Sequence, residues 1–415
     1  MTHIQKISDL PKVLGALREL TVERSPIANL WRLGLVLLLP ALGYTFYMLF
    51  TTGHDSFNTS SDGVIWGISQ AVYVSFVLTS TGLTFMASLA MVFGLKEIYP
   101  IAKRCIWLAV ATLIAGFSVL GLEIGHPFRM AWSMPTGMQV LSPMFWMGTW
   151  YAIYMVLLLL KFYQVNRGDW HSLVSRALGV ASFVSVVIAH GTLGSLFGML
   201  NMRPLWYDPL LPFYFLATAA LSGAAFALFF THATYGFSSD RMPVDVRERA
   251  LAQISKVFAA MLGVVIVLIA SRTISHLWSN GDGLQIVHET VRTTTFLLEM
   301  TIGLTVPFVL MLFERMRRSP IVVVLSSAAV IVGLFVARYE FVVGGQQSPM
   351  FKGVAAHTLP AYTPSSMEWA MALVGVSLCL VIYAAGDKLF RLSAAPAVEH
   401  AGPQSVSDAA PPASP

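Results

Sequence analysis

Residues 320–341 read PIVVVLSSAAVIVGLFVARYEF, an almost uninterrupted apolar run. Its only charged side chains are Arg338 and Glu340, close to its end. A bilayer core of about 30 Å is crossed by a helix of roughly 20 apolar residues. Similar runs recur along the chain and bring the total to ten. They lie near residues 29–51, 64–94, 102–122, 143–163, 174–199, 210–232, 254–278, 293–313, 320–341 and 366–386.

The composition of the whole chain also indicates a membrane protein. Of its 415 residues, 56% are hydrophobic and 11% are charged, and the mean hydropathy is +0.69. A soluble domain could not bury so much apolar surface. The apolar runs are continuous and do not alternate with a period of two, which excludes a transmembrane β-barrel. We therefore expect an all-α integral membrane protein of about ten transmembrane helices with a four-helix-bundle core.

The two ends of the chain differ from the apolar middle. Residues 1–27 are polar and charged, and they lack the pattern of a cleavable signal peptide. Residues 393–415 are rich in Ala, Pro and Ser and have little to bury. The expected organisation is a cytoplasmic N-terminal segment over 1–27, a ten-helix transmembrane domain over 28–392, and a disordered cytoplasmic tail over 393–415.

The positions of Lys and Arg predict the orientation, because cytoplasmic loops carry an excess of these residues. If both termini are cytoplasmic, the inner loops receive all but six of the 26 basic residues. We therefore expect a multi-pass protein of the cell inner (cytoplasmic) membrane. The six that fall on the outward side are Arg129, Arg203, Arg272, Arg292, Arg338 and Lys352.

Many polar and ionisable residues gather near the outward ends of the predicted spans. Ionisable groups in hydrocarbon cost several kcal/mol unless they are paired or wet, so their concentration predicts a polar pocket that opens outward. Helix-end ion pairs at the lipid headgroups are the alternative, and Arg338 could extend its side chain outward. His190 is expected to lie within the hydrocarbon. The residues are Trp66, Gln70, Glu123, His126, His190, Asp208, Arg272, His276, Glu299, Arg338, Glu340 and Glu368.

The sequence offers few ligands for a resident metal centre. Cys105 and Cys379 both fall in apolar stretches, which leaves no disulfide framework and no four-thiolate iron–sulfur site. A bis-histidine haem needs two facing imidazoles within spans, and His232 lies at the opposite end from His190. We expect no haem or iron–sulfur cluster in this chain.

Several short motifs carry a family resemblance. The segment EIGHPFR, Glu123 to Arg129, resembles the acid-x-Gly-basic-Pro-x-x-basic turn of the NrfD/PsrC family of quinone-reactive membrane subunits, and SPMFWMGTW, Ser142 to Trp150, is similar to the helix start that follows it. The part of the chain from about residue 60 to 390 resembles the longer, HybB-like branch of this family, which has ten spans. Its features here are Trp66-Gly67, AHGTLGSL at 189–196, RPLW at 203–206, Arg338-Tyr339 and Tyr362-Thr-Pro-x-x-x-Glu368.

The resemblance implies a membrane subunit of a respiratory oxidoreductase complex, which is not a complete enzyme alone. Such subunits pair on the outer face with a ferredoxin-like iron–sulfur protein and a molybdopterin, hydrogenase or cytochrome catalytic subunit. They exchange electrons and protons with menaquinone or ubiquinone near that face. The loops at 123–142 and 342–365 would form the docking floor for the iron–sulfur subunit, with ordinary loops as the alternative.

Each role in the predicted quinone site follows from side-chain chemistry. A quinone carbonyl that gains electrons must be protonated, and an imidazole can both donate and recover a proton near neutral pH. His190 is the expected donor, and Glu123 with His126 forms the relay to outer water. Arg338 and Arg129 hold Glu123, Glu368 or Glu340 ionised, or they orient the quinone ring. The predicted cofactor-binding residues are Trp66, Gln70, Arg129, Trp146, Trp150, Arg338 and Glu368.

Some positions depart from the family pattern. The turn has Glu123 and His126 where the family commonly has Asp and Arg, and Trp146 and Lys161 replace acids of hydrogenase-type subunits. His232 follows Thr231 where those proteins carry Glu. Inner-face acids are therefore scarce, and we expect protons to be exchanged with the outer side rather than passed across the membrane.

Two other classes of function fit parts of the sequence. A secondary transporter would also have ten spans and buried charges, but carriers commonly show inverted repeats around a midplane site. Here the polar groups lie toward one face, and no inverted repeat is evident. A passive membrane anchor is the other alternative, although it would not require His190 in the hydrocarbon.

Overall fold

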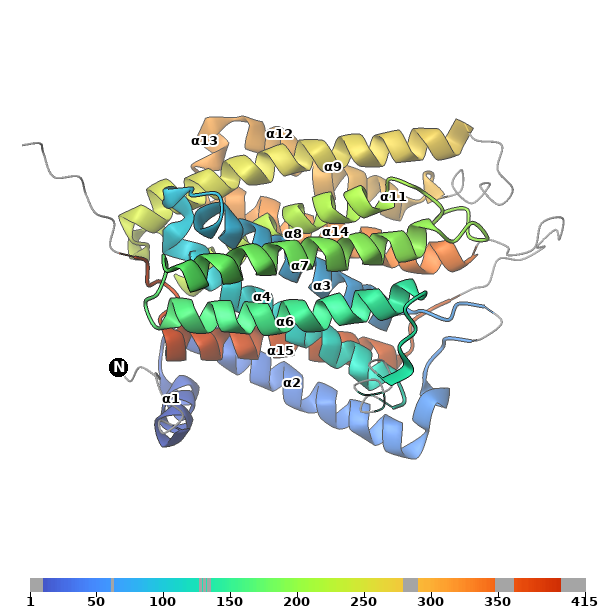
Figure 1. Ribbon diagram of the computed structural model, residues 1–415, viewed down its shortest axis with the longest axis horizontal. Helices are drawn as coiled ribbons and strands as arrows, with labels where there is room; N and C mark the ends of the chain where they lie inside the picture. Colours follow the sequence, from blue (N-terminus) through green and yellow to red (C-terminus); the bar gives the residue numbers. More distant parts are fainter. Residues whose placement is uncertain are drawn as a thin grey trace, which may run out of the picture.

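The computed structural model describes residues 10–60, 63–126, 129, 132, 136–278, 290–347 and 362–396. Within these residues every regular element is helical, and ten helical segments are long and apolar enough to cross a membrane. The spanning helices run side by side along the long axis of the molecule (Figure 1). The expected all-α architecture with ten transmembrane helices is thus confirmed.

The helix bounds agree with most of the expected runs to within a few residues. The eighth span is interrupted by a π-helix, η6, that ends just before Pro307. The spans are α2 (Pro26–Thr51), α3 (Ile68–Met91), α4 (Tyr99–Glu123), α6 (Pro143–Asn166), α7 (Leu173–Gly198), α8 (Leu211–Thr234), α9 (Ala252–Trp278), α11 (Thr294–Leu298) with η6 (Glu299–Thr305) and α12 (Val306–Leu312), α14 (Pro320–Gln347) and α15 (Ser366–Phe390).

The ninth span is longer than expected. α14 continues to Gln347, so residues 342–347 are helical and do not belong to an outer loop. Gly345 permits this continuation, because a Cβ at that position would lie 1.8 Å from Nε1 of Trp206. Arg338 consequently lies nine residues before the helix end, deeper than the sequence indicated. Residues 348–361, most of the expected docking floor on this side, lie outside the described residues.

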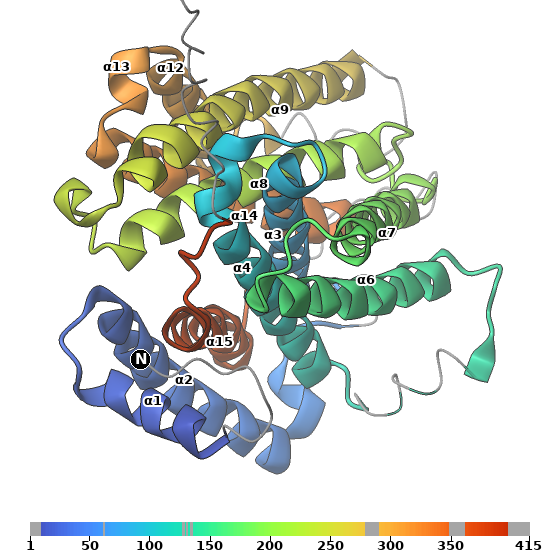
Figure 2. The same cartoon turned by 60° about the vertical axis from the view of Figure 1, so that its left-hand side comes forward.

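The spans form two packed groups. α3 packs along α4 and α6 packs along α7, and further contacts join α3 to α7 and α4 to α6, which gives the expected four-helix bundle. In the second group, α8 packs against α9 and α14, and α12 contacts both of these helices. α2 and α15 pack together, and α15 also contacts α4, as Figure 2 shows from the turned view.

Glycines bring the two groups into close contact between α3 and α8. A Cβ on Gly82 would lie 1.8 Å from the carbonyl oxygen of Ala219, and one on Gly223 would lie 2.0 Å from the carbonyl carbon of Gly82. Small residues let the backbones of membrane helices approach in this way. Any larger residue at either position would separate the two groups.

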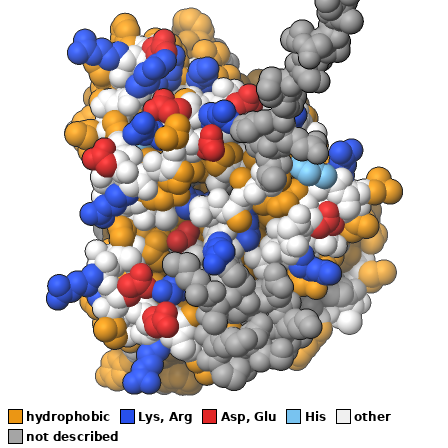
Figure 3. All heavy atoms as spheres, turned by 90° about the vertical axis from the view of Figure 1, so that its left-hand side faces the viewer, with side chains coloured by type: hydrophobic (Ala, Val, Ile, Leu, Met, Phe, Trp, Pro, Cys, Tyr) orange, Lys and Arg blue, Asp and Glu red, His pale blue; other side chains and the backbone are white. Residues whose placement is uncertain are grey.

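Both described ends of the chain lie at one end of the molecule. A short helix that the sequence did not predict, α1 (Leu10–Val22), lies beside the end of α15, where Lys388 pairs with Glu23 at 2.5 Å and with Glu19 at 3.4 Å. Figure 3 shows this face, with Lys and Arg side chains spread over it and acids between them. We call it the N-terminal end, and the opposite face the distal end. Residues 397–415, nearly all of the tail expected to be disordered, lie outside the described residues.

Candidate functional site

His190 is fully buried in α7, within the four-helix bundle. Its Nδ1 lies 2.6 Å from Oγ1 of Thr81 on α3 and 3.0 Å from the hydroxyl of Tyr151 on α6. Its Nε2 is buried and has no hydrogen-bond partner in the described part of the chain. One ring nitrogen is therefore fixed, and the other is available.

One tautomer of the neutral His190 ring fits the hydrogen bonds around Nδ1. The Thr81 hydroxyl donates to the carbonyl oxygen of Val77 at 3.1 Å. When it does so, its oxygen can accept the Nδ1 proton of His190, and Nε2 of the neutral ring then carries a lone pair. A buried polar atom without a partner costs about 1–3 kcal/mol. Nε2 is thus a proton acceptor whose bonding capacity the described residues do not use.

Aromatic rings connect His190 to the other helices of the bundle. The ring of Tyr151 meets the imidazole edge-on with centroids 5.7 Å apart, and Phe117 of α4 meets Tyr151 in the same way at 5.7 Å. Tyr73 of α3 continues the series, 5.5 Å from Phe117. We call these four residues the aromatic layer; its three other rings link the imidazole of His190 to α6, α4 and α3.

Three of the predicted site residues lie on the distal side of the aromatic layer. Gln70 is partly buried, one turn before Tyr73 on α3, and Trp150 is partly buried beside Tyr151 on α6. Glu123 ends α4, and its Oε2 is buried without a hydrogen-bond partner among the described residues. The distal half of one bundle therefore contains two polar atoms, Nε2 of His190 and Oε2 of Glu123, with unused bonding capacity.

Glu123 also adjoins a cavity at the distal end. Nε2 of His54, which follows α2, donates to the carbonyl oxygen of Glu123 at 3.0 Å. His54, His126 and Arg129 line a cavity of about 920 Å³ between the ends of α2 and α4. His126 and Arg129 are exposed. Glu123 therefore lies between the bundle and this cavity, whose lining includes the neighbouring residues 122 and 124.

Arg338 of α14 lies in the second helix group, where it faces α8. Its side chain is 8% exposed and donates to Oγ of Ser222 at 2.5 Å and to the carbonyl oxygen of Thr218 at 3.4 Å, both on α8. It pairs with no carboxylate in the described residues, so the ion pairs expected with Glu123, Glu340 or Glu368 are not formed. The predicted pairings are wrong because Arg338 points toward α3 and α8, and its alternative role, to orient the quinone ring, stays a prediction.

Glu368 is an anchor between two helix starts. It is fully buried, and Oε1 accepts a 2.5 Å bond from the hydroxyl of Tyr362 while Oε2 accepts from the backbone of Ser365 at 2.8 Å, closing a capping box on α15. The Tyr362 hydroxyl accepts a bond from the backbone of Ile68, at the start of α3. Burial and the bond to Glu368 raise the pKa of Tyr362 above its ordinary value. Both carboxylate oxygens of Glu368 are therefore occupied within the protein.

Two of the predicted tryptophans lie outside the aromatic layer. Trp66 stacks on Trp206 with centroids 5.7 Å apart, and the side chain of Gln346 accepts bonds from the backbone of residues 65 and 66. Trp146 is 42% exposed and donates from Nε1 to the carbonyl oxygen of Val140 at 2.8 Å. Neither ring is among the described contacts of His190.

The other polar residues that were predicted near the outward helix ends form a second polar group, around α8, α9 and α14. Asp208 and Arg272 pair at 3.1 Å. Glu299 is 6% exposed and lines a cavity of about 140 Å³ together with Glu340 and His276. The polar residues that the sequence assigned to one pocket thus lie in separate groups, because they sit on different sides of α3 and α8.

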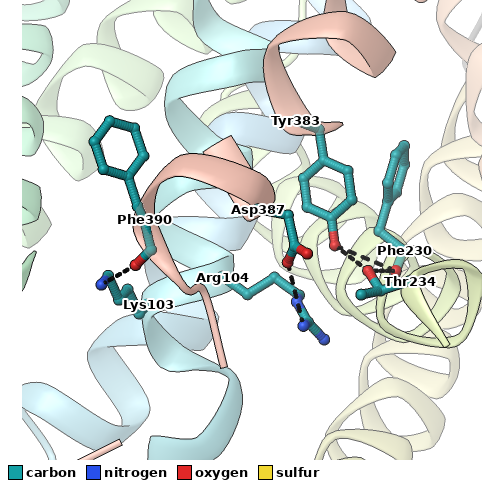
Figure 4. Close-up of polar contacts among 7 residues, drawn as sticks. All are labelled: Lys103, Arg104, Phe230, Thr234, Tyr383, Asp387 and Phe390. Carbon is teal, nitrogen blue, oxygen red and sulfur yellow. Dashed lines mark hydrogen bonds and ion pairs between the residues drawn. The ribbon is translucent and has the colours of Figure 1, made fainter. Parts of the chain in front are cut away.

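The N-terminal end contains buried charges near the start of α4 and the end of α15. Nη2 of Arg104 on α4 lies 3.6 Å from Oδ1 of Asp387 on α15 (Figure 4). Nζ of the nearby Lys103 donates a hydrogen bond to the carbonyl oxygen of Phe390 at 2.5 Å. The Tyr383 hydroxyl lies 2.5 Å from Oγ1 of Thr234 in the same view. Asp387 did not stand out as a functional acid in the sequence.

Sequence reasoning also missed the partners of His190. Thr81 and Tyr151 carry no charge, and both lie within apolar runs. A usable signal existed: Ser80, Thr81 and Thr84 place three hydroxyl groups within about one helical turn of an apolar span. Tyr154 uses two of them, since its hydroxyl lies 2.9 Å from Oγ of Ser80 and 2.6 Å from Oγ1 of Thr84.

The described residues contain no group of three or more His, Cys, Asp and Glu side chains that could hold a metal ion. The absence of haem and of an iron–sulfur cluster remains a prediction.

Comparison with known proteins identifies the family. The sequence profile described as polysulphide reductase, NrfD, matches residues 57–350, which is most of the chain. The chain belongs to the NrfD family. The matched region of this NrfD-family protein runs from just before α3 to the end of α14, so it contains His190, Thr81, Tyr151 and Arg338. The HybB-like branch remains a prediction.

Three similar proteins are named as subunits of redox enzymes. A selenate reductase subunit of Mesobacillus selenatarsenatis is 23% identical over 76% of this chain and 83% of its own length. The Hdr-like menaquinol oxidoreductase integral membrane subunit of Archaeoglobus fulgidus is 25% identical over 86% and 92%. A putative dimethyl sulfoxide reductase membrane subunit of Halobacterium salinarum is 23% identical over 87% and 90%. The NrfD-family chain is thus similar to membrane subunits of reductase complexes over most of their length.

Proposed function

We propose that this protein is the membrane subunit of a respiratory oxidoreductase complex that exchanges electrons and protons with menaquinone or ubiquinone in the distal half of the four-helix bundle. The observation that carries the proposal is Nε2 of His190, a buried ring nitrogen to which no described residue makes a hydrogen bond. The name of one relative, a menaquinol oxidoreductase subunit, supports quinone as the substrate.

The chemistry requires a proton acceptor at the ring. Oxidation of a quinol releases two protons and two electrons, and reduction of a quinone consumes the same number. The Nε2 lone pair of His190 accepts a proton from a quinol hydroxyl and, once protonated, returns it to a quinone carbonyl in the reverse direction. Thr81 and Tyr151 keep the ring oriented in both states.

Glu123 provides the second proton-transfer group. Its Oε2 is buried without a partner among the described residues, and its backbone contacts His54, which lines the distal cavity. A carboxyl group in this position relays protons between the ring and the cavity, with His126 at the exposed side. Proton exchange then takes place on the distal side of the membrane.

Electrons would pass to a ferredoxin-like iron–sulfur subunit docked on the distal end, and from there to a molybdopterin, hydrogenase or cytochrome catalytic subunit. The names of the relatives as subunits of reductases support such an assembly. The basic residues at the N-terminal end support an orientation with that end in the cytoplasm and the distal end outward, in a cell inner membrane.

The test compares two histidines at opposite ends of the protein. In the intact complex, His190→Gln and His190→Ala should lower quinone-linked turnover by about 10²- to 10⁴-fold, the usual contribution of a general acid–base. His232→Gln is the matched control, because His232 is also buried but lies in the last turn of α8, toward the N-terminal end of the molecule. Normal turnover of an assembled His190→Ala complex would remove His190 from the quinone site.

A further inference from the structure

A groove of about 520 Å³ lies between α3, α8, α14 and α15, outside the four-helix bundle. Its walls are apolar except for Ser75, Thr79 and Arg338. Val332 is 62% exposed and Trp369 is 55% exposed at its rim, so the groove opens sideways toward the surrounding lipid. Lipid-soluble molecules can therefore reach it without leaving the membrane.

Arg338 lies in this groove with bonding capacity unused. Its guanidinium donates to Ser222 and to carbonyl oxygens of Thr218 and Ser75, but its Nε is buried and has no partner in the described residues. A cation in hydrocarbon without a paired anion is costly and marks a functional site. Guanidinium has five donors and no acceptor, so the missing partner is a hydrogen-bond acceptor.

The depth of Arg338 in the membrane indicates which kind of molecule carries that acceptor. Nine residues of α14 separate it from the distal helix end, which corresponds to about 13 Å at 1.5 Å per residue. Phospholipid headgroups remain at the interface, whereas a quinone is a neutral ring with carbonyl acceptors and an apolar tail that resides in the hydrocarbon. Phe76, Phe335 and Trp369 line the same groove and offer aromatic surfaces to such a ring.

We propose that this groove binds a quinone ring, with a ring carbonyl accepting a hydrogen bond from Arg338, as a site separate from that of His190. The two sites are separate because they lie on opposite sides of α3. Thr79 lines the groove and Thr81 contacts His190, and two residues correspond to a rotation of about 200° around a helix. Binding in the groove requires no electron transfer, so it goes beyond the proposed function.

The experiment uses the full chain in phosphatidylcholine nanodiscs and an azido-benzoquinone with a decyl tail as a photoreactive probe. Labelled residues are mapped by mass spectrometry. The expected labels lie in α14 and α15. Ala372→Phe, which fills the groove, and Arg338→Met, which removes the donor, should each reduce that labelling by at least about tenfold. Unlabelled decyl quinone should compete, and oleate should not.

Control variants separate binding in the groove from nonspecific labelling by the probe. Val267→Phe adds an aromatic ring at an exposed position on α9 that does not line the groove, and labelling of α14 and α15 should be unchanged. His190→Ala should likewise keep the groove label while turnover falls. Labelling that is absent from α14 and α15, unaffected by both groove variants, or displaced by oleate would overturn the inference. None of these results bears on the turnover test of His190.

Discussion

The hydroxyl of Tyr151 lies 3.0 Å from Nδ1 of His190, and the two rings meet edge-on. This relationship makes Tyr151 a positioning residue for the imidazole. Tyr151→Phe keeps the ring packing and removes one hydrogen bond worth about 0.5–1.5 kcal/mol, so quinone-linked turnover should fall about 2- to 12-fold. Tyr154→Phe is the control, because its hydroxyl contacts Ser80 and Thr84 rather than His190. Equal rates for the two variants would contradict the role of Tyr151.

Glu123 should be needed for proton exchange but not for assembly. Glu123→Gln retains the shape of the side chain and removes its ability to carry a proton, so turnover should fall by about 10²-fold or more. Glu123→Asp should recover part of the rate. Glu97→Gln, at the N-terminal end, provides the control. The relay would be disproved by a Glu123→Gln complex whose rate and pH profile match those of the unmodified protein.

The contact between α3 and α8 should tolerate no side chain at Gly82. Gly82→Ala places a Cβ 1.8 Å from the carbonyl oxygen of Ala219, so the helices must separate. We expect a loss of stability of about 1–3 kcal/mol or more, seen as a lower midpoint of thermal unfolding. Gly191→Ala in α7 meets nothing within 4 Å and should be neutral or stabilising. Equal midpoints for the two variants would argue against this close contact.

The ion pair between Arg104 and Asp387 should matter most when only one partner is removed. The Arg104 side chain is 3% exposed, so Asp387→Asn leaves a buried cation without its anion, at a cost of about 3 kcal/mol. The double variant Arg104→Met with Asp387→Leu should regain much of that stability, because neither charge remains. Thermal unfolding in detergent measures both. A double variant that is less stable than Asp387→Asn would show that the charge has another partner.

Tyr362→Phe tests the link between the starts of α3 and α15. A group whose folded pKa is raised contributes stability that is fully present below its unfolded pKa, about 10 for tyrosine, and that is lost as the pH rises through the folded value. Since the pKa of Tyr362 is raised, its bond to Glu368 should persist at alkaline pH. The unfolding midpoint should drop on Tyr362→Phe by the same amount at pH 7 and at pH 9. A difference that shrinks by pH 9 would contradict this.

The spans could be predicted from sequence because the requirement is local. Backbone groups in a bilayer must be bonded within their own helix, so apolar length alone indicated the run at 254–278, and α9 is Ala252–Trp278. The same argument failed at the end of α14. There the helix continues through Gly344 and Gly345 because Trp206, far away in sequence, packs against it.

The ten-span helical architecture, the family motifs and the position of His190 within an apolar span could all be read from the amino-acid sequence. The partners of each polar residue, in contrast, became visible in the packed helices. This packing joined His190 to Thr81 and Tyr151, and it turned Arg338 to the other side of α3. The physical reason is that hydropathy depends on neighbours along one helix, whereas a side chain's partners depend on how helices distant in sequence pack and rotate against one another.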